Sequence, residues 1–354
     1  MQFVFKGKKI TGMLGVLPEN EYLFEDETRN FSPSHARRLK KIMGYGKRRR
    51  VKKDTTTSDL CIFGMNYLLE HDLIKKEDVG AIIVSTMTPD YFVPHVSNIV
   101  HGECGFSDEV VCLDIPQACT GFLLGLLQAF MLLDHMKDKK IVVFTADVLN
   151  RKIYDEEVFT EPPFGGDAAT VTIVENDGAA EDIYFDIRMD GKDRNCLIMP
   201  TGGFRMPWTE SDEKVDIGDG ILRDANRLNM DGSTVFNFVQ QKVPPLIDDL
   251  MKFANKSKED MDWFLFHQPN KFMLQKLAEK LGVPYEKMFM NIVEEYGNSS
   301  GSVIGINIVH NLGSKLEDDL YECCLSAFGG GLSWGALIMQ LGNMDFCEMI
   351  ESNL

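Results

Sequence analysis

One cysteine lies at a junction of the chain where it could act as a nucleophile. The segment DIPQACTGF, residues 114–122, places Cys119 between two apolar runs. We expect the first run to be a strand and the second a helix, so that Cys119 lies just before a helix N-terminus. Free backbone N–H groups and the helix dipole favour negative charge there, which predicts a lowered pKa and a nucleophilic thiol. The alternative is an inert buried cysteine, which we expect for Cys61, Cys112 and Cys196.

Three segments of the second half carry groups that could complete such a site. His267 ends the apolar run WFLFH, Asn298 lies in YGNSSGS, and residues 329–331 read GGG. A neutral His Nε2–H and an Asn amide together offer two donors to a developing enolate oxygen, and a glycine N–H can approach a thioester oxygen closely. Taken singly, the same groups could be a core histidine, an N-cap and a turn.

A repeat in the chain predicts that these residues meet. Buried strands are expected at residues 81–88, 110–115 and 140–147, and an apolar helix at 122–136, which indicates a layered α/β fold. A single shift of 181 positions aligns three pairs of segments: IIVST (82–86) with WFLFH, QACTG (117–121) with NSSGS, and VVFTA (142–146) with CCLSA. We infer two copies of one unit about a pseudo-twofold axis, with their equivalent strand ends converging on one centre.

Composition sets the wider limits. A length of 354 residues favours two domains or two fused halves, assigned to residues 1–178 and 179–354, and the 44% hydrophobic content is ample for a core. A net charge of −17 argues against a general nucleic-acid binder. The apolar runs are too short for a membrane span, and early lysines argue against a secretory peptide. Eight cysteines without framework spacing indicate a reduced, cytoplasmic protein, and the absence of C-x-x-C and H-E-x-x-H motifs predicts no metal.

One basic segment opposes the overall charge. Residues 37–53 hold ten basic side chains and no acidic one. They fit a solvated charged helix followed by a loop, or a local anion site for phosphates or an acidic partner protein.

The motifs together resemble those of a known family. DIPQACTGFLLGL, HQPN, GNSSGS and SAFGGGLSWGAL occur in the order found in thiolase-fold condensing enzymes, and the chain most resembles β-ketoacyl-acyl-carrier-protein synthase III. One Cys with one His and one Asn distinguishes this type from the thiolases and the elongating synthases. The resemblance implies a thiolase-like fold, with two pseudo-symmetric halves in a five-layered α-β-α-β-α core. It also implies a homodimer in which the strand near residues 110–115 pairs across the axis.

The resemblance further implies a two-stage reaction without a metal or redox cofactor. Cys119 would take an acyl group from acyl-CoA, with the N–H groups of Cys119 and Gly330 holding the oxyanion. Malonyl-acyl carrier protein would then lose CO2, His267 and Asn298 would hold its enolate oxygen, and the carbanion would attack the thioester. By the same resemblance Arg48 and Arg49 would contact CoA phosphates, and Asn270 the pantetheine arm.

Some positions depart from the family pattern. The segment HQPNKFM has Phe272 where the family has an arginine that helps to dock the carrier protein. The alternative function is therefore a pathway-specific condensing enzyme or acyltransferase of secondary metabolism, with the same acyl-Cys intermediate and a different acceptor. Two hypotheses come from other functional classes: a cysteine hydrolase that acts on thioesters, and a non-catalytic scaffold protein.

Overall fold

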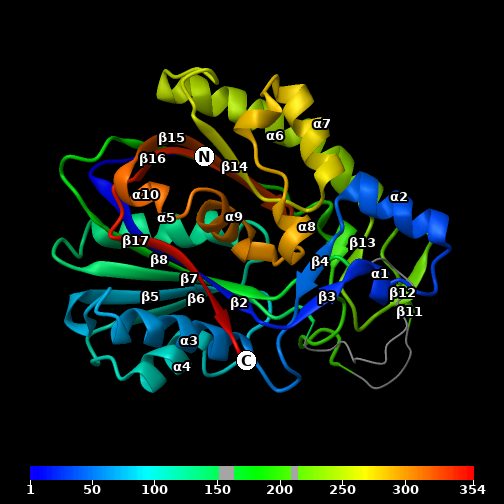
Figure 1. Cartoon of the computed structure of the whole chain (residues 1–354), viewed down its shortest axis with the longest axis horizontal. Helices are drawn as coiled ribbons and strands as arrows, with labels where there is room; N and C mark the ends of the chain where they lie inside the picture. The colour runs from blue at the N-terminus through cyan, green and yellow to red at the C-terminus, as the bar shows by residue number, and fades with distance from the viewer. Residues whose placement is uncertain (151–162, 209–213) are drawn as a thin grey trace.

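The fold is a stack of five layers in which two β-sheets enclose central helices (Figure 1). A computed structural model describes residues 1–150, 163–208 and 214–354. Helices α5 (Gly121–Leu133) and α9 (Val303–Asn311) lie between the sheets. Helices α3 (Thr57–Glu70) and α4 (Val96–Cys104) cover the outer face of one sheet, and α6 (Gly232–Ala254) and α7 (Lys271–Leu281) cover the outer face of the other. The layered α/β architecture expected from alternating strand and helix runs is confirmed.

Two sheets supply the strand layers. The six-stranded sheet has the order β17-β2-β8-β7-β5-β6, in which β8 runs antiparallel to its neighbours. Its strands are β2 (Lys8–Pro18), β5 (Val79–Ser85), β6 (Val111–Ile115), β7 (Lys140–Asp147), β8 (Ala168–Asn176) and β17 (Phe346–Ser352). The five-stranded sheet has the order β1-β9-β16-β15-β14. Its strands are β1 (Gln2–Phe5), β9 (Ile183–Met189), β14 (Trp263–Phe266), β15 (Leu320–Gly329) and β16 (Ser333–Gly342).

Strand register confirms the sequence repeat. In the first half Ile82 of β5 pairs with Val142 of β7, and in the second half Trp263 of β14 pairs with Cys323 of β15. Both members of the second pair are shifted by 181 from the first. The order β5-β7-β8-β2 is likewise repeated as β14-β15-β16-β9. At the chain ends the halves exchange strands, because β1 joins the second sheet and β17 joins the first.

The helices range from single turns to the long α6. They are α1 (Phe24–Glu27), α2 (Pro33–Met43), α3 (Thr57–Glu70), α4 (Val96–Cys104), α5 (Gly121–Leu133), α6 (Gly232–Ala254), α7 (Lys271–Leu281), α8 (Ile292–Tyr296), α9 (Val303–Asn311) and α10 (Lys315–Asp318). The 3₁₀ turns within the described residues are η1 (Lys76–Asp78), η2 (Arg194–Cys196), η3 (Tyr285–Lys287) and η4 (Ser300–Ser302). Short antiparallel pairs in the same part of the chain join β3 (Glu21–Leu23) to β4 (Lys47–Arg49), β10 (Leu197–Ile198) to β13 (Asn229–Met230), and β11 (Lys214–Asp216) to β12 (Leu222–Asp224).

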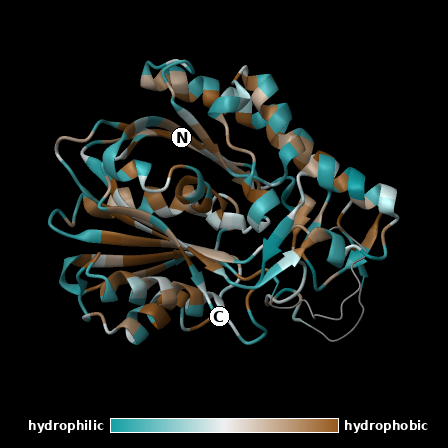
Figure 2. Cartoon of the chain, viewed as in Figure 1, coloured by the Kyte–Doolittle hydropathy of each residue, from teal (hydrophilic) through white to brown (hydrophobic). Residues whose placement is uncertain are grey.

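The apolar helix predicted near residues 122–136 is α5, and it occupies the centre of the molecule (Figure 2). Phe122 and Phe130 are fully buried, and a buried phenylalanine contributes roughly 1.5–3 kcal/mol relative to an exposed one. Gly125 brings α5 close to β7, since a Cβ there would lie 2.6 Å from Cγ1 of Val143. Tight packing on the sheet fixes where the N-terminus of α5 lies, and with it the position of Cys119.

The basic segment begins with the predicted helix. Ser32 caps α2 by accepting a hydrogen bond from the backbone N–H of His35, and α2 ends at Gly44 in the left-handed region at φ 74°. Where a loop was expected, residues 47–49 instead form β4, which pairs with β3. Among the helices in the described ranges, none has the length and hydropathy needed to cross a membrane.

Candidate active site

The turn that carries Cys119 is hydrogen-bonded to the glycine-rich turn of the other half, the GGG turn at residues 329–331. Nε2 of Gln117 donates to the carbonyl oxygen of Gly330 at 3.1 Å and to Oγ of Ser333 at 3.0 Å. Thr120, the N-cap of α5, contacts the same Ser333 hydroxyl at 2.8 Å. A Cβ on Gly329 would lie only 2.7 Å from Cβ and 3.0 Å from Sγ of Cys119. The predicted meeting of the cysteine and the GGG turn is therefore confirmed.

His267 follows β14, at the same edge of its sheet as the GGG turn. Its backbone N–H donates to the carbonyl oxygen of Ser326 on β15, the strand that leads to Gly329. The side chain is 1% exposed, and its ring meets the edge of Phe328 at 5.7 Å between centroids. Burial lowers the imidazole pKa to about 3, so the ring is neutral at physiological pH. A neutral imidazole is the state in which Nε2–H can act as a donor without carrying charge.

Asn298 is held by its backbone and by its side-chain oxygen. Its N–H donates to the carbonyl oxygen of Phe164 at 2.8 Å, and its carbonyl oxygen accepts from the N–H of Gly166 at 3.0 Å. Oδ1 accepts from the N–H of Ser300 at 2.9 Å. Because the amide oxygen is used in this way, the Nδ2 group is the end left to donate. The side chain thus matches the donor predicted for an enolate oxygen.

Ser300 links the asparagine turn to the cysteine turn. It is the residue that the 181-position repeat aligns with Cys119, and its hydroxyl interacts with the Cys119 thiol. Ser300 has a φ of 56°, in the left-handed region that few side chains adopt. A Cβ on the adjacent Gly301 would lie 3.1 Å from the carbonyl oxygen of Ala118. The two turns are therefore in close contact across the pseudo-symmetry axis.

The predicted lowering of the Cys119 pKa is wrong. Burial and, to a smaller extent, the nearby Asp147 carboxylate raise the pKa of this thiol to about 12, although the interaction with Ser300 acts in the opposite direction. Part of the residue still reaches solvent. The thiol is therefore protonated at neutral pH, and its attack on a thioester must be accompanied by loss of the S–H proton.

Asp147 is a member of the site that sequence reasoning missed. It ends β7, is fully buried, and accepts hydrogen bonds at Oδ1 from the N–H of Met87 at 2.8 Å and the hydroxyl of Thr86 at 3.0 Å. Its Oδ2 accepts from the N–H of Gly301 at 3.5 Å. Burial raises its pKa to about 6. The signal in the sequence was a carboxylate at the end of the apolar run KIVVFTAD, beside the cysteine turn.

The residues predicted to bind CoA have internal partners. Arg48 is 3% exposed and forms an ion pair with Glu27, and Arg49 forms one with Glu351 at 2.8 Å. Both arginines therefore have ion-pair partners within the fold, and phosphate contact by either of them stays a prediction. Oδ1 of Asn270 caps α7 by accepting from the N–H of Met273 at 2.9 Å, which leaves its Nδ2 for a ligand. Within the described residues, no His, Cys, Asp or Glu side chains form a group of three that could hold a metal ion.

Burial of neutral His267 makes a prediction for stability. Its pKa of about 3 lies below the ordinary 6.5, so between these values the unfolded chain binds more protons than the native protein. This contribution is present above pH 6.5 and is lost as pH falls toward 3, by about 1.4 kcal/mol per pH unit. Urea unfolding at pH 7, 6 and 5 should therefore show His267→Gln losing less stability with acid than the wild type. Equal losses of stability in the wild type and in His267→Gln would contradict this prediction. The buried Asp147 has the opposite pH dependence, but it is present in both proteins and its effect cancels in the comparison.

Comparisons with known proteins agree with the geometry. Family models described as 3-oxoacyl-[acyl-carrier-protein] synthase III and its C-terminal part match residues 113–191 and 251–341. The chain is 31% identical over 335 residues to a β-ketoacyl-[acyl-carrier-protein] synthase III of Fusobacterium nucleatum, covering 94% of this chain and 98% of that one. A β-ketoacyl-[acyl-carrier-protein] synthase III of Streptococcus uberis is 31% identical over 297 residues, which cover 83% of this chain and 88% of that one. The crystal structure of a 3-oxoacyl-(acyl-carrier protein) synthase from Burkholderia xenovorans superposes with a TM-score of 0.91 at 29% identity, covering 99% of both chains.

Proposed function

Since the chain belongs to the 3-oxoacyl-[acyl-carrier-protein] synthase III family, we propose that it joins an acyl group from acyl-CoA to malonyl-acyl carrier protein and releases CO2. It is an acyltransferase with the thiolase-like fold. One observation carries the proposal: the Cys119 turn is packed on the GGG turn and on the Ser300 turn that follows Asn298.

The first stage is transfer of the acyl group to the cysteine. Sγ of Cys119 attacks the thioester carbon, the S–H proton is lost, and the CoA thiol leaves after taking up a proton. The backbone N–H groups of Cys119 and Gly330 hold the negative oxygen of the tetrahedral intermediate. Gly329 supports this stage because only a residue without a side chain fits 2.7 Å from Cβ of Cys119.

The second stage is decarboxylation and carbon–carbon bond formation. The malonyl group loses CO2, and the electron pair of the broken bond becomes an enolate. Its oxygen accepts hydrogen bonds from Nε2–H of His267 and Nδ2–H of Asn298, and its carbon attacks the acyl-Cys119 thioester. The thiolate of Cys119 is expelled and takes up a proton. A neutral His267 supports this role, because its donor N–H does not depend on protonation above a pKa of about 3.

We propose a homodimer formed along β6. This strand is the last one in the order of the six-stranded sheet, so one of its edges has no neighbouring strand within the described chain. Val111 on β6 is 39% exposed, which is unusual for a strand beside an apolar core. Unpaired edges are the usual places where two sheets join. A cytoplasmic location is also proposed, and its support is that all eight cysteines are free thiols.

The test is product analysis by mass spectrometry. The wild-type protein is incubated with acetyl-CoA or a medium-chain acyl-CoA and malonyl-acyl carrier protein. We expect an acyl adduct on the protein, followed by CO2 and a β-ketoacyl-carrier protein. Free acid as the sole product would favour a thioester hydrolase instead, and absence of any adduct would overturn the proposal. Replacing the malonyl-carrier protein by malonyl-CoA in a parallel reaction determines which acceptor is used.

Gly329 provides a sharp test of the geometry around Cys119. We expect Gly329→Ala to lower the rate of acyl-enzyme formation at least tenfold, because its Cβ would overlap Cβ of Cys119. The matched control is Gly102→Ala on α4, where a new Cβ would have no heavy atom within 4 Å. The same change of residue type outside the site should leave acylation close to the wild-type rate. Stopped-flow or quenched intact-mass measurements compare the two; equal rates in both variants would show that the crowding at Gly329 is unimportant.

A further inference from the structure

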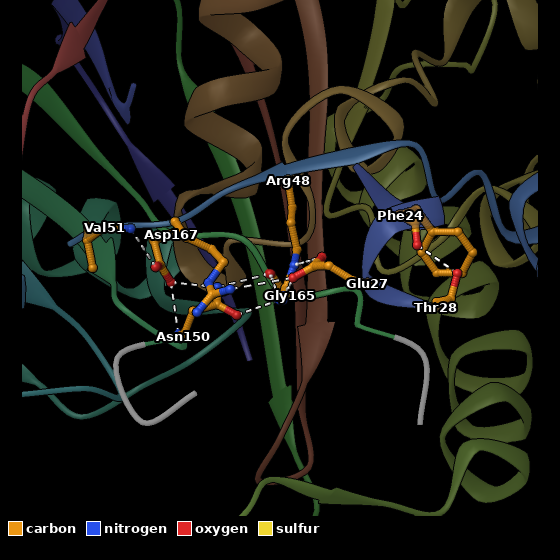
Figure 3. Close-up of polar contacts among 9 residues, drawn as sticks. Phe24, Glu27, Thr28, Arg48, Val51, Asn150, Gly165 and Asp167 are labelled. Atoms are coloured by element: carbon orange, nitrogen blue, oxygen red, sulfur yellow. Dashed lines mark hydrogen bonds and ion pairs between the residues drawn. The ribbon is translucent and has the colours of Figure 1, made fainter. Parts of the chain in front are cut away.

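The basic segment contains one arginine, Arg48, that lies outside the group formed by Cys119, His267 and Asn298. Arg48 lies on β4 with its side chain 4% exposed, facing Glu27 of α1, which is 8% exposed (Figure 3). Nε of Arg48 donates to Oε2 of Glu27 at 2.6 Å, and Nη2 donates to Oε1 of the same carboxylate. The pair is bidentate, which fixes the plane of the guanidinium group.

The remaining nitrogen of the guanidinium group points away from Glu27. Nη1 donates to the carbonyl oxygen of Gly165 at 2.9 Å and to Oδ1 of Asn150. Asn150 bonds the same Gly165 carbonyl through Nδ2 at 3.0 Å, and Nδ2 also donates to Oδ1 of the fully buried Asp167 at 2.9 Å. The carbonyl oxygen of Gly165 therefore accepts hydrogen bonds from both Arg48 and Asn150, and each of these side chains is held by further partners (Figure 3).

The residues on either side of Gly165 hold the backbone of Asn298. The carbonyl oxygen of Phe164 accepts from the N–H of Asn298 at 2.8 Å, and the N–H of Gly166 donates to the Asn298 carbonyl oxygen at 3.0 Å. Gly165 and Asn298 form an isolated parallel bridge outside the sheets. Two hydrogen bonds to one residue fix its orientation as well as its position.

Arg48 also packs directly on the residue before Asn298. Gly297 has a φ of 78°, and a Cβ there would lie 2.8 Å from Cβ of Arg48 and 3.0 Å from the nitrogen of Gly166. A Cβ on Gly166 would lie 2.2 Å from the carbonyl oxygen of Tyr296. No side chain fits between β4, residues 164–166 and the turn at 297–298, so displacement of Arg48 is transmitted to that turn.

We propose that Arg48 is a positioning residue: through Gly165 it fixes the Asn298 amide as the donor to the enolate oxygen. The inference rests on the proposed function. A displacement of about 1 Å in a group that holds a reacting atom can lower a rate on the order of 100-fold, so a buried clamp on Asn298 has a direct kinetic consequence. It also gives Arg48 a role different from the phosphate contact predicted from the sequence.

The test compares Arg48→Lys with Arg50→Lys. A lysine keeps the charge opposite Glu27, but its single ammonium cannot reproduce the planar fork that reaches Glu27, Asn150 and Gly165 together. Arg50 is the matched control, because it is also buried, pairs with Glu27 at 3.5 Å and stacks over the ring of Tyr22. We expect Arg48→Lys to lower kcat for malonyl decarboxylation roughly 10- to 100-fold, with acylation of Cys119 and the KM for acyl-CoA near wild-type values. Arg50→Lys should leave both stages close to wild type.

A second measurement separates the outcomes. In hydrogen exchange, peptides covering residues 163–167 and 297–300 should exchange faster in Arg48→Lys than in Arg50→Lys. Unchanged decarboxylation with unchanged exchange would overturn the proposal, and so would a raised KM for acyl-CoA with unchanged decarboxylation, which would indicate CoA binding. If Arg48→Lys does not fold, the Glu27→Gln/Arg48→Gln double variant, which leaves no unpaired charge, takes its place. If the wild type itself neither acylates nor decarboxylates, the proposed function has failed, and the exchange data alone decide whether Arg48 fixes Asn298.

Discussion

Cys119→Ala should take up no label from radiolabelled acyl-CoA and should form β-ketoacyl product at least roughly 10⁴-fold more slowly than the wild type. The expectation follows from the loss of the sulfur proposed to carry the acyl group between the two stages, and nucleophile removal in other enzymes that act through a covalent intermediate has effects of this size. The measurement is intact-mass detection of the acyl-enzyme together with the rate of product formation.

The matched control is Cys112→Ala. Cys112 lies on β6 seven positions before Cys119, is partly exposed like Cys119, and also has a raised pKa because of burial. We expect this variant to acquire one acyl group as the wild type does. Labelling of Cys119→Ala at the wild-type level would remove the covalent stage from the mechanism. Loss of labelling in both variants, with both folded, would mean that the acyl group is not specific to Cys119.

The repeat explains why the placement of the site could be predicted from sequence alone. Strand alternation with a constant shift of 181 predicts which strand ends are equivalent, and the pairings Ile82–Val142 and Trp263–Cys323 bear this out. Parallel strands bring their carboxyl ends to one edge of a sheet, so residues such as His267 and Gly329 are placed by topology. Topology of this kind depends on hydrophobic periodicity, which a single sequence displays.

The thiol pKa could not be predicted in the same way. The local rule, that a helix N-terminus favours a thiolate, considers only the backbone next to Cys119. In the folded protein the thiol is enclosed by residues distant in sequence and lies near the buried carboxylate of Asp147, and together these raise the pKa to about 12. Desolvation depends on the whole surrounding packing, which no local motif encodes.

The internal pairing of Arg48 in the basic segment could not be predicted for a related reason. A run of arginines predicts an anion site on the surface, because exposed arginines are far commoner than buried ones. Glu27, which neutralises Arg48, is 21 positions away in a single-turn helix, α1, with no strong sequence signal of its own. Pairing of distant charges is decided by tertiary structure, and here it directs the Arg48 guanidinium group to Glu27 and to the carbonyl oxygen of Gly165.

His267→Ala should separate the two stages of the reaction. We expect it to form the acyl-enzyme on Cys119 near the wild-type rate while lowering malonyl decarboxylation and condensation roughly 10²- to 10³-fold, the usual loss for one donor of an oxyanion hole. The physical reason is that the enolate oxygen would keep only the Asn298 amide as its hydrogen-bond donor. The rates are measured separately, by intact mass for acylation and by release of labelled CO2 for decarboxylation.

His310→Ala is the matched control for His267→Ala, because His310 is a half-buried histidine of α9 that hydrogen-bonds the Tyr296 hydroxyl at 2.9 Å and has no role in the proposed reaction. It should leave both stages within a few-fold of wild type. If His267→Ala instead stops acylation, the imidazole acts on the proton of Cys119. That outcome is disfavoured by its pKa of about 3, since so weak a base holds a proton poorly while the thiol it would have to deprotonate has a pKa of about 12. The low pKa of His267 agrees with its assignment to hydrogen-bond donation in the second stage.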